Sequence, residues 1–162
     1  MVYTVTFNPA LDYVVRVEKL TVGGANRAGQ AEIQPGGKGI NVSCVLHELV
    51  VETTALGFVA GFTGCELERE LARRGVRTKF IHLAEGQTRI NVKLKGQEET
   101  EINAAGPVIL PEAQRRLLEQ RGIRSLCITP IFIGARLAGF LVLDNIRRHW
   151  PELSVLKIGR AS

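Results

Sequence analysis

The stretch Gln34-Pro35-Gly36-Gly37-Lys38-Gly39-Ile40-Asn41 decides how the first half of the chain folds. Proline and three glycines suit neither a helix nor a regular strand, so we predict a loop over residues 34–39. Apolar side chains at helical spacing predict a helix directly after it, over residues 40–50. A glycine-rich loop that enters a helix directs unpaired N–H groups and the positive end of the helix dipole to one point. We therefore expect an anion there, with Lys38 adding charge and Asn41 one turn further on.

This loop is not a Walker P-loop. The residue five positions before Gly37 is Glu32, and the residue after Lys38 is Gly39 rather than serine or threonine. Taken alone, the loop fits a tight strand-to-helix connection as well as it fits a binding loop.

The segments around the loop predict an α/β fold. Residues 2–7 and 13–17 have strand patterns, and residues 53–60 form an apolar run of buried-strand length. Residues 64–74 form an amphipathic helix, with Gly75 at the usual C-terminal position. Strands that alternate with helices are typical of a parallel sheet.

A second strand pair is predicted outside the main layer. Residues 88–94 and 100–103 flank a polar, charged segment, which is the pattern of a hairpin.

The last third of the chain differs from the rest, and we predict a domain boundary near residue 108. Pro111 is placed to begin a helix. Residues 125–143 are nearly apolar, but Arg136 and the breaks at residues 130 and 134–135 favour two antiparallel strands over a membrane span. Residues 151–160 predict a short final helix. For the tail, residues 109–162, the sequence thus predicts a helix, a hairpin and a second helix.

Charge and cysteine content narrow the function classes. Of the net charge of +5, residues 1–109 contribute nothing, because they hold 12 basic and 12 acidic side chains. Residues 110–162 hold nine basic and four acidic side chains, and apolar residues interleave the arginines, which favours a solvated helix face over a nucleic-acid site. The three cysteines, without a CxxC pair, support neither a disulfide framework nor a metal site. With no signal-peptide pattern, we expect a cytoplasmic protein without membrane or nucleic-acid partners.

Four polar side chains near the predicted strands are candidates for ligand contacts. Asp12 follows the first strand, where a carboxylate can accept from two adjacent sugar hydroxyls or cap a turn. Arg27 and Arg89 can each hold a phosphate through two parallel hydrogen bonds, although a single arginine is more often a surface residue. Asn103, at the end of the hairpin, suits either a turn or a ligand contact.

Five motifs in order resemble one family. They are Tyr3-Thr4-Val5-Thr6-Phe7-Asn8-Pro9-Ala10-Leu11-Asp12, Pro35-Gly36-Gly37-Lys38-Gly39-Ile40-Asn41-Val42, Gly57-Phe58-Val59-Ala60-Gly61-Phe62-Thr63-Gly64, Thr88-Arg89-Ile90-Asn91 and Thr100-Glu101-Ile102-Asn103. Together they resemble the N-terminal half of the PfkB, ribokinase-like carbohydrate kinases, in the branch that phosphorylates sugar phosphates. The resemblance covers residues 1–108 and implies a partial ribokinase-like parallel sheet with helices and a small β lid.

The resemblance also implies a substrate and a role for several residues. Asp12 and Asn41 would bind sugar hydroxyls, and Gly37 and Lys38 would lie under the sugar. Arg27 and Arg89 would hold the phosphate of fructose 1-phosphate or tagatose 6-phosphate, between which the sequence does not choose.

Asn103 of the lid joins this predicted substrate site. ATP and Mg²⁺ are the cofactors that the family implies, and a homo-oligomer is left open.

The chain departs from the family after residue 108. Family members are roughly twice as long, and their second half supplies the anion hole, the catalytic base, the magnesium element and the adenine pocket, none of which is in this sequence. We therefore assign no catalytic and no metal-binding residue, and we expect the chain to be inactive alone. A truncated or fused chain without activity, or completion of the site by a partner chain, stays open.

Residues 109–162 resemble the C-terminal part of a GAF sensor domain. The likeness lies in the segments around residues 110–118, 122–126, 130–132, 137–140 and 144–145. It implies a sensor or interaction module as an alternative function, with no ligand assigned. The other interpretation is a helix and hairpin that only cap the sheet.

Overall fold

A computed structural model describes residues 2–120, 125–133, 136–144 and 155–157, with side chains described through residue 120. The chain divides into two compact units, Met1–Ile109 and Leu110–Ser162. The parallel α/β class predicted for the first unit is confirmed, and this unit carries two separate sheets.

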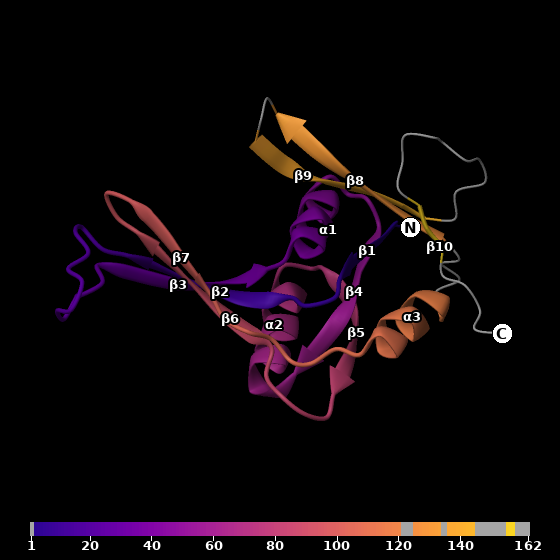
Figure 1. The fold of residues 1–162 in the computed structure, drawn as a ribbon, viewed down its shortest axis with the longest axis horizontal. Helices are drawn as coiled ribbons and strands as arrows, with labels where there is room; N and C mark the ends of the chain where they lie inside the picture. Colours follow the sequence, from indigo (N-terminus) through magenta and orange to yellow (C-terminus); the bar gives the residue numbers. More distant parts are fainter. Residues whose placement is uncertain (1, 121–124, 134–135, 145–154, 158–162) are drawn as a thin grey trace. The chain divides into compact units, whose positions relative to one another are not determined.

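The first sheet is the structural centre of unit 1. Strands β1 (Val2–Thr6), β4 (Thr53–Ala60) and β5 (Arg77–Leu83) pair in parallel in the order β1-β4-β5. Helices α1 (Lys38–Glu48) and α2 (Gly61–Arg73) pack on it (Figure 1). Every residue of β4 is buried, which is why this strand appears in the sequence as a continuous apolar run rather than an alternating one. We call β1, β4 and β5 the core sheet.

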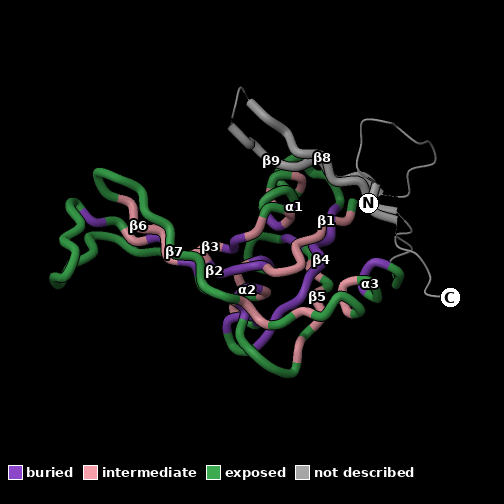
Figure 2. Tube along the Cα trace, in the orientation of Figure 1, coloured by how far each residue is buried: buried purple, intermediate pink, exposed green. Residues whose placement is uncertain are grey.

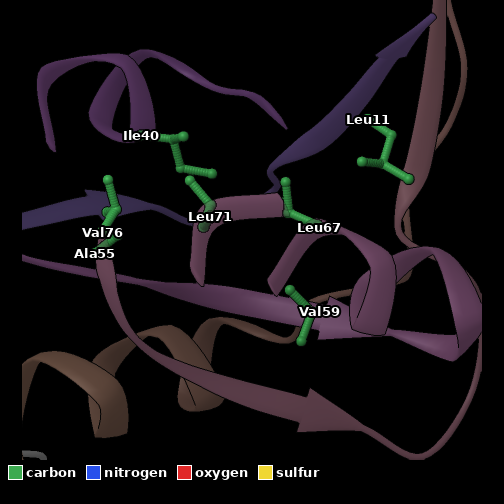
Figure 3. Packing of buried hydrophobic residues seen from close by; sticks show 7 residues of the cluster. All are labelled: Leu11, Ile40, Ala55, Val59, Leu67, Leu71 and Val76. Atoms are coloured by element: carbon green, nitrogen blue, oxygen red, sulfur yellow. The ribbon is translucent and has the colours of Figure 1, made fainter. Parts of the chain in front are cut away.

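One hydrophobic cluster joins the core sheet to both helices (Figure 3). The cluster contains Ala55 and Val59 of β4, Ile40 of α1, and Leu67 and Leu71 of α2. Because Ala55 and Val59 lie an even number of residues apart, they point to the same face of the strand, so both helices cover that face. Full burial of each large aliphatic side chain contributes about 1.5–3 kcal/mol to folding.

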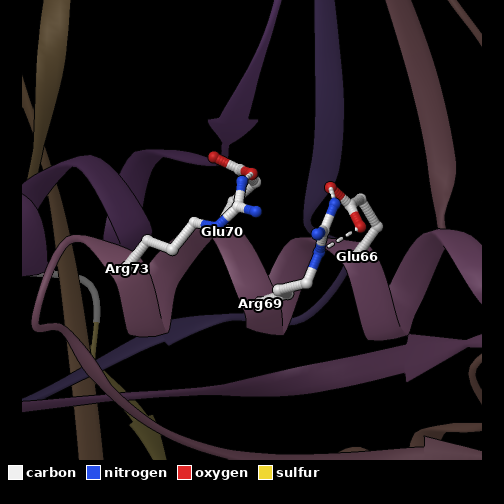
Figure 4. Close-up of polar contacts among 4 residues, drawn as sticks. All are labelled: Glu66, Arg69, Glu70 and Arg73. Carbon is white, nitrogen blue, oxygen red and sulfur yellow. Dashed lines mark hydrogen bonds and ion pairs between the residues drawn. The ribbon is translucent and has the colours of Figure 1, made fainter.

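The opposite side of α2 is solvated and charged. Arg69 Nε donates to Glu66 Oε2 at 2.7 Å, and Arg73 Nη1 donates to Glu70 Oε1 at 2.7 Å (Figure 4). The hydrogen bond from Arg69 lowers the pKa of Glu66. These pairs three residues apart sit on the solvent side of a helix whose other side is apolar, as the sequence predicted.

The second sheet of unit 1 is the predicted lid. Its order is β3-β2-β6-β7, from β2 (Ala10–Arg16), β3 (Gln30–Gly36), β6 (Arg89–Lys95) and β7 (Glu99–Asn103). Strands β2 and β6 are parallel and the other two pairs are antiparallel. Much of this sheet is exposed, whereas β4, the central strand of the core sheet, is buried throughout (Figure 2).

The two faces of the lid differ in polarity. One register row joins Ile33, Tyr13, Val92 and Ile102, one residue from each strand, and three of these are exposed. The adjacent row joins Gln34, Asp12, Asn91 and Asn103. Since neighbouring residues in a strand point to opposite faces, the lid has an apolar face and a polar face. The polar face carries the candidate residue Asp12.

The predicted loop over residues 34–39 is wrong at every position except Gly37. Strand β3 continues through Pro35 to Gly36, and helix α1 begins at Lys38 rather than at residue 40. Strand β3 lies at the edge of the lid, where proline is tolerated because one side of the strand needs no donor. Strand β5 was not predicted, because its charged residues mask its alternation.

Unit 2 contains α3 (Pro111–Glu119) and the antiparallel strands β8 (Ser125–Ile133), β9 (Arg136–Asp144) and β10 (Val155–Lys157), in the order β10-β8-β9. The helix at Pro111 and the strand pair are confirmed. The final helix is wrong where it can be compared, because residues 155–157 pair with the edge of β8. The rest of that predicted helix and the turn at residues 134–135 lie outside the described residues. None of the helices that the structure describes is long and apolar enough to cross a membrane.

Candidate functional site

Asp12 lies in the middle of β2, on the polar face of the lid. Its side chain is 13% exposed, and both of its oxygens are engaged from strand β6. Asn91 Nδ2 donates to Oδ1 at 2.9 Å, and Lys93 Nζ lies 2.9 Å from Oδ2. Neighbouring β6 therefore holds the carboxylate in one orientation. Because Asp12 lies inside a strand, it does not cap a turn, and the ligand contact stays a prediction.

Lys93 connects Asp12 to the outer strand of the lid. Besides its ion pair with Asp12, its Nζ lies 3.6 Å from Glu101 Oε1. The hydrogen bond with Asp12 is the main cause that raises the pKa of Lys93, so the ammonium stays charged at neutral pH. Sequence reasoning gave no role to Lys93 or Asn91, although the polar alternation along β6 could have shown that both share a face with Arg89.

The glycine motif packs against this carboxylate. A Cβ atom at Gly36 would lie 2.6 Å from Asp12 Oδ1, so only glycine lets β3 pass so close to the acid. Gly37 has φ +132°, a region that L-residues rarely adopt, and a Cβ there would meet Thr6 Cγ2 at 2.7 Å. A Cβ at Gly39 would lie 2.7 Å from the carbonyl oxygen of Val5. The motif thus brings the start of α1 beside both the core sheet and Asp12.

The first turn of α1 presents the two polar side chains that the sequence selected. Lys38 and Asn41 are exposed, and the Asn41 N–H donates to the carbonyl oxygen of Gly37 at 2.9 Å. The hydroxyl of Thr6 accepts from the N–H of Ile40 at 3.2 Å, which ties the helix start to β1. The helix start is fixed while its polar side chains face solvent.

Arg89 begins β6 and is held by the residue before it. The buried Thr88 hydroxyl accepts from the N–H of Ala60 at 2.9 Å, and the Thr88 carbonyl oxygen accepts from Thr63 Oγ1 at 2.7 Å. Arg89 pairs in register with Ala10, two residues before Asp12, so both side chains lie on the polar face. The structure thus brings Arg89 and Asp12 to one side of the lid.

Three buried polar atoms near these residues have no hydrogen-bond partner among the described residues. They are Arg89 Nε, Asn91 Oδ1 and Asn8 Oδ1. An unpaired buried polar atom costs roughly 1–3 kcal/mol, so each needs a water or a ligand group. Two of the three belong to the polar face of the lid.

Arg27 and Asn103 lie further from Asp12. Arg27 is in the exposed connection between β2 and β3, beyond Arg16, and lines an open concavity of about 660 Å³. At about 3.3 Å per residue, Arg16 is roughly 13 Å along β2 from Asp12, so the structure does not bring Arg27 beside Arg89. Asn103 shares the register row of Asp12 but is exposed and two strands away.

The described residues contain no group of three His, Cys, Asp or Glu side chains that could hold a metal ion. A kinase Mg²⁺ is held by one or two carboxylates together with substrate phosphates, so the Mg²⁺ that the sequence resemblance implies stays a prediction. Cys44 and Cys65 are free thiols, and burial raises the pKa of Cys44. The side chain of the third cysteine, Cys127, is outside the described part of the chain.

Residues 5–126 match the family described as pfkB family carbohydrate kinase. The 1-phosphofructokinase of Bacillus subtilis (strain 168) is 52% identical over 120 residues, which make up 74% of this chain and 39% of that protein. The D-tagatose-1-phosphate kinase of Bacillus licheniformis is 38% identical over 120 residues, with the same two shares.

Solved structures are similar to this chain over the same share of its length as the related sequences. The structure of phosphofructokinase-2 from Escherichia coli in complex with fructose-6-phosphate superposes with a TM-score of 0.66 and 29% identity, over 74% of this chain and 40% of that one. The chain thus spans about two fifths of the length of the relatives it matches. The matched range ends at residue 126, and the GAF-like interpretation of residues 109–162 stays a prediction.

Proposed function

Because the chain belongs to the pfkB family of carbohydrate kinases, we propose that residues 1–108 are the substrate-binding part of an ATP-dependent kinase for a phosphorylated ketose. The observation that carries the proposal is the Asp12 carboxylate, which is fixed beside the glycine motif on the same lid face as Arg89. A fixed carboxylate binds adjacent hydroxyls, and a guanidinium binds phosphate. One face of the lid therefore offers both groups that a sugar phosphate needs.

The proposal assigns the site residues as follows. Asp12 and Asn41 bind sugar hydroxyls, Gly37 and Lys38 lie under the sugar, and Arg89 binds the phosphate that the sugar already carries. Arg27 as a second phosphate ligand and Asn103 as a lid contact remain predictions, because neither lies beside Asp12. Names of the relatives support fructose 1-phosphate and a tagatose phosphate as substrates to test first.

Phosphoryl transfer itself needs more than these residues. The attacking hydroxyl forms a bond to the terminal phosphorus of ATP, ADP leaves, and a base accepts the hydroxyl proton. The proposal assigns Asp12 to hydroxyl binding rather than to this base, because the resemblance places the family's catalytic base in the half that this chain does not match. We therefore expect the 162-residue chain to form no ADP from ATP and fructose 1-phosphate in a coupled assay. Turnover that Asp12→Ala abolishes would contradict this expectation.

An NMR titration tests the binding proposal. Amide shifts of the uniformly ¹⁵N-labelled chain are followed with fructose 1-phosphate and with fructose. We expect weak, about millimolar binding of the phosphate ester, strongest at Lys38 and Arg89 and weakened by salt. Equal shifts with both sugars, or none near Lys38 and Arg89, would disprove the phosphate assignment.

Exposed apolar side chains on the lid support the homo-oligomer that the sequence left open. We propose that a second copy of the chain covers the apolar face at Tyr13, Ile33 and Ile102, which are 40%, 46% and 57% exposed. The row carries no charge, so two identical faces can meet without repulsion. Sedimentation tests this. Ile102→Lys should shift the chain to monomer, whereas a wild-type chain that sediments as a monomer at high concentration would refute the pairing.

A further inference from the structure

The contacts of Asp12 leave part of its binding capacity free. An ionised carboxylate offers about four acceptor sites on its two oxygens. Asn91 and Lys93 each occupy one site, one on either oxygen. About two acceptor sites are left for a ligand, which matches the pair of adjacent hydroxyls of a sugar. The two β6 residues therefore orient the carboxylate without filling it.

Asn91 has a free group of its own beside this carboxylate. The residue is 6% exposed, and its Oδ1 has no hydrogen-bond partner among the residues described. Since Nδ2 donates to Asp12, the amide orientation is set, and Oδ1 must face a donor other than Asp12. A sugar hydroxyl is both a donor and an acceptor, so one hydroxyl can donate to Asp12 or to Asn91 Oδ1.

We propose that Asn91 is a further sugar-binding residue and that Lys93 is the positioning residue that holds Asp12 for the same sugar. The inference rests on the proposed function, since it requires that a sugar phosphate occupies the polar face of the lid. It gives a separate role to each of three successive residues that β6 places on the polar face of the lid. Arg89 binds phosphate, Asn91 binds a hydroxyl, and Lys93 orients the acid.

A purely structural ion pair would look different. Lys95, two residues further along β6, pairs with Glu99 at 3.4 Å, and both side chains are exposed, at 41% and 57%. Lys93 and Asp12 are 28% and 13% exposed and 2.9 Å apart. Asp12 thus has a partly buried partner at the place where the glycine motif passes, whereas the Lys95 pair is an ordinary surface contact. Lys95 is the matched control, with the same charge, strand and face.

The test compares a ligand that carries sugar hydroxyls with a phosphate that has no sugar. Fructose 1-phosphate and inorganic phosphate are titrated by NMR into the full chain and into Asn91→Leu, Lys93→Met and Lys95→Met. We expect Asn91→Leu and Lys93→Met to weaken fructose 1-phosphate about tenfold while phosphate binding stays within about twofold. Lys95→Met should leave both within about twofold, and Lys93→Arg should restore most of the affinity, because it keeps a donor to Asp12.

The outcomes separate this inference from the proposed function. Wild-type-like affinity in Asn91→Leu and Lys93→Met, with binding still lost in Arg89→Ala, overturns the inference alone. Equal weakening of phosphate and sugar phosphate in Lys93→Met makes Lys93 a phosphate ligand and also overturns it. No preference of the wild-type chain for fructose 1-phosphate over phosphate overturns the proposed function as well. Asn91→Ala replaces Asn91→Leu if the dispersion of its amide spectrum is lost.

Discussion

The central strand of the core sheet and the outer strand of the lid differ completely in exposure. All eight residues of β4 are buried, whereas all five residues of β7 are exposed. The core sheet is covered by helices on the face of Ala55 and Val59, while the polar face of the lid holds a charged cluster around Asp12. The core sheet thus supplies stability, and the lid supplies binding groups that need access to a ligand.

The largest effect should come from the core sheet side of this comparison. Leu67→Ala removes a fully buried side chain and should lower the free energy of unfolding by about 3 kcal/mol, within a range of roughly 2–5. The counterpart Val22→Ala, in the connection between the lid strands β2 and β3 at a side chain that is 91% exposed, should change it by less than about 1 kcal/mol. Urea denaturation followed by circular dichroism measures both. Equal losses of unfolding free energy in the two variants would show that the core sheet does not contribute more stability than the lid.

Arg89→Ala should have the opposite effect to Leu67→Ala: it should weaken ligand binding strongly and change the free energy of unfolding little. The affinity for fructose 1-phosphate should fall about tenfold or more, because a hydrogen bond to a charged group contributes roughly 1.5–3 kcal/mol. Stability should change less than in Leu67→Ala, since Arg89 Nε has no partner in the described structure to lose. The control is Arg77→Ala on β5, whose guanidinium pairs with Glu52 at the surface. An equal loss of affinity in the control would make the effect one of net charge.

Thr88 joins the two sheets, so its substitution tests whether they are coupled. Thr88→Val leaves the N–H of Ala60 without its acceptor and should cost about 1–3 kcal/mol of stability. It should also weaken binding of the sugar phosphate, because the same hydroxyl fixes the start of β6. Thr88→Ser keeps the hydroxyl and should restore both properties. Hydrogen exchange at the Ala60 amide reports the bond directly, and unchanged exchange in Thr88→Val would show that it is not made.

The smallest effect is expected at the solvent side of α2. Arg69 lowers the pKa of Glu66, so their contact stabilises the fold above the unfolded pKa of the acid and is lost as pH falls through the lower, folded value. Both charges are screened by water, so Glu66→Gln should leave the melting temperature unchanged at neutral pH within error. A drop as large as that of Thr88→Val would show that this exposed pair matters more than its position suggests.

Local patterns predicted several elements correctly. The apolar run of β4, the amphipathic helix α2 and the hairpin of β6 and β7 follow from periodicity and turn residues. Gly75 is at φ +74°, the left-handed position expected after a helix. Strand β3 was missed because Pro35 is a strand breaker except at an edge, and its edge position follows from the order of the lid strands.

The sequence predicted only part of the candidate site, because the rest depends on which strands of the lid pair. Asp12 and Arg89 stand out as single charged residues beside predicted strands, and both lie on the polar face of the lid. Arg27 was grouped with Arg89, yet it lies beyond the end of β2, because the exposed connection that carries it extends away from Asp12. Asn91 and Lys93 were overlooked, since neither forms a recognisable pattern with Asp12 along the chain.

The sequence by itself determined the family, the buried apolar run of β4 and a glycine-rich entry into α1. These properties are local, because they depend on side-chain types and on spacings within a few residues. Only the tertiary structure decided which groups meet the carboxylate. Asn91 is 79 residues from Asp12, and the parallel register of β2 and β6 sets them opposite each other. A slip of one residue would turn Asn91 and Lys93 to the apolar face, so the site depends on strand pairing rather than on any segment alone.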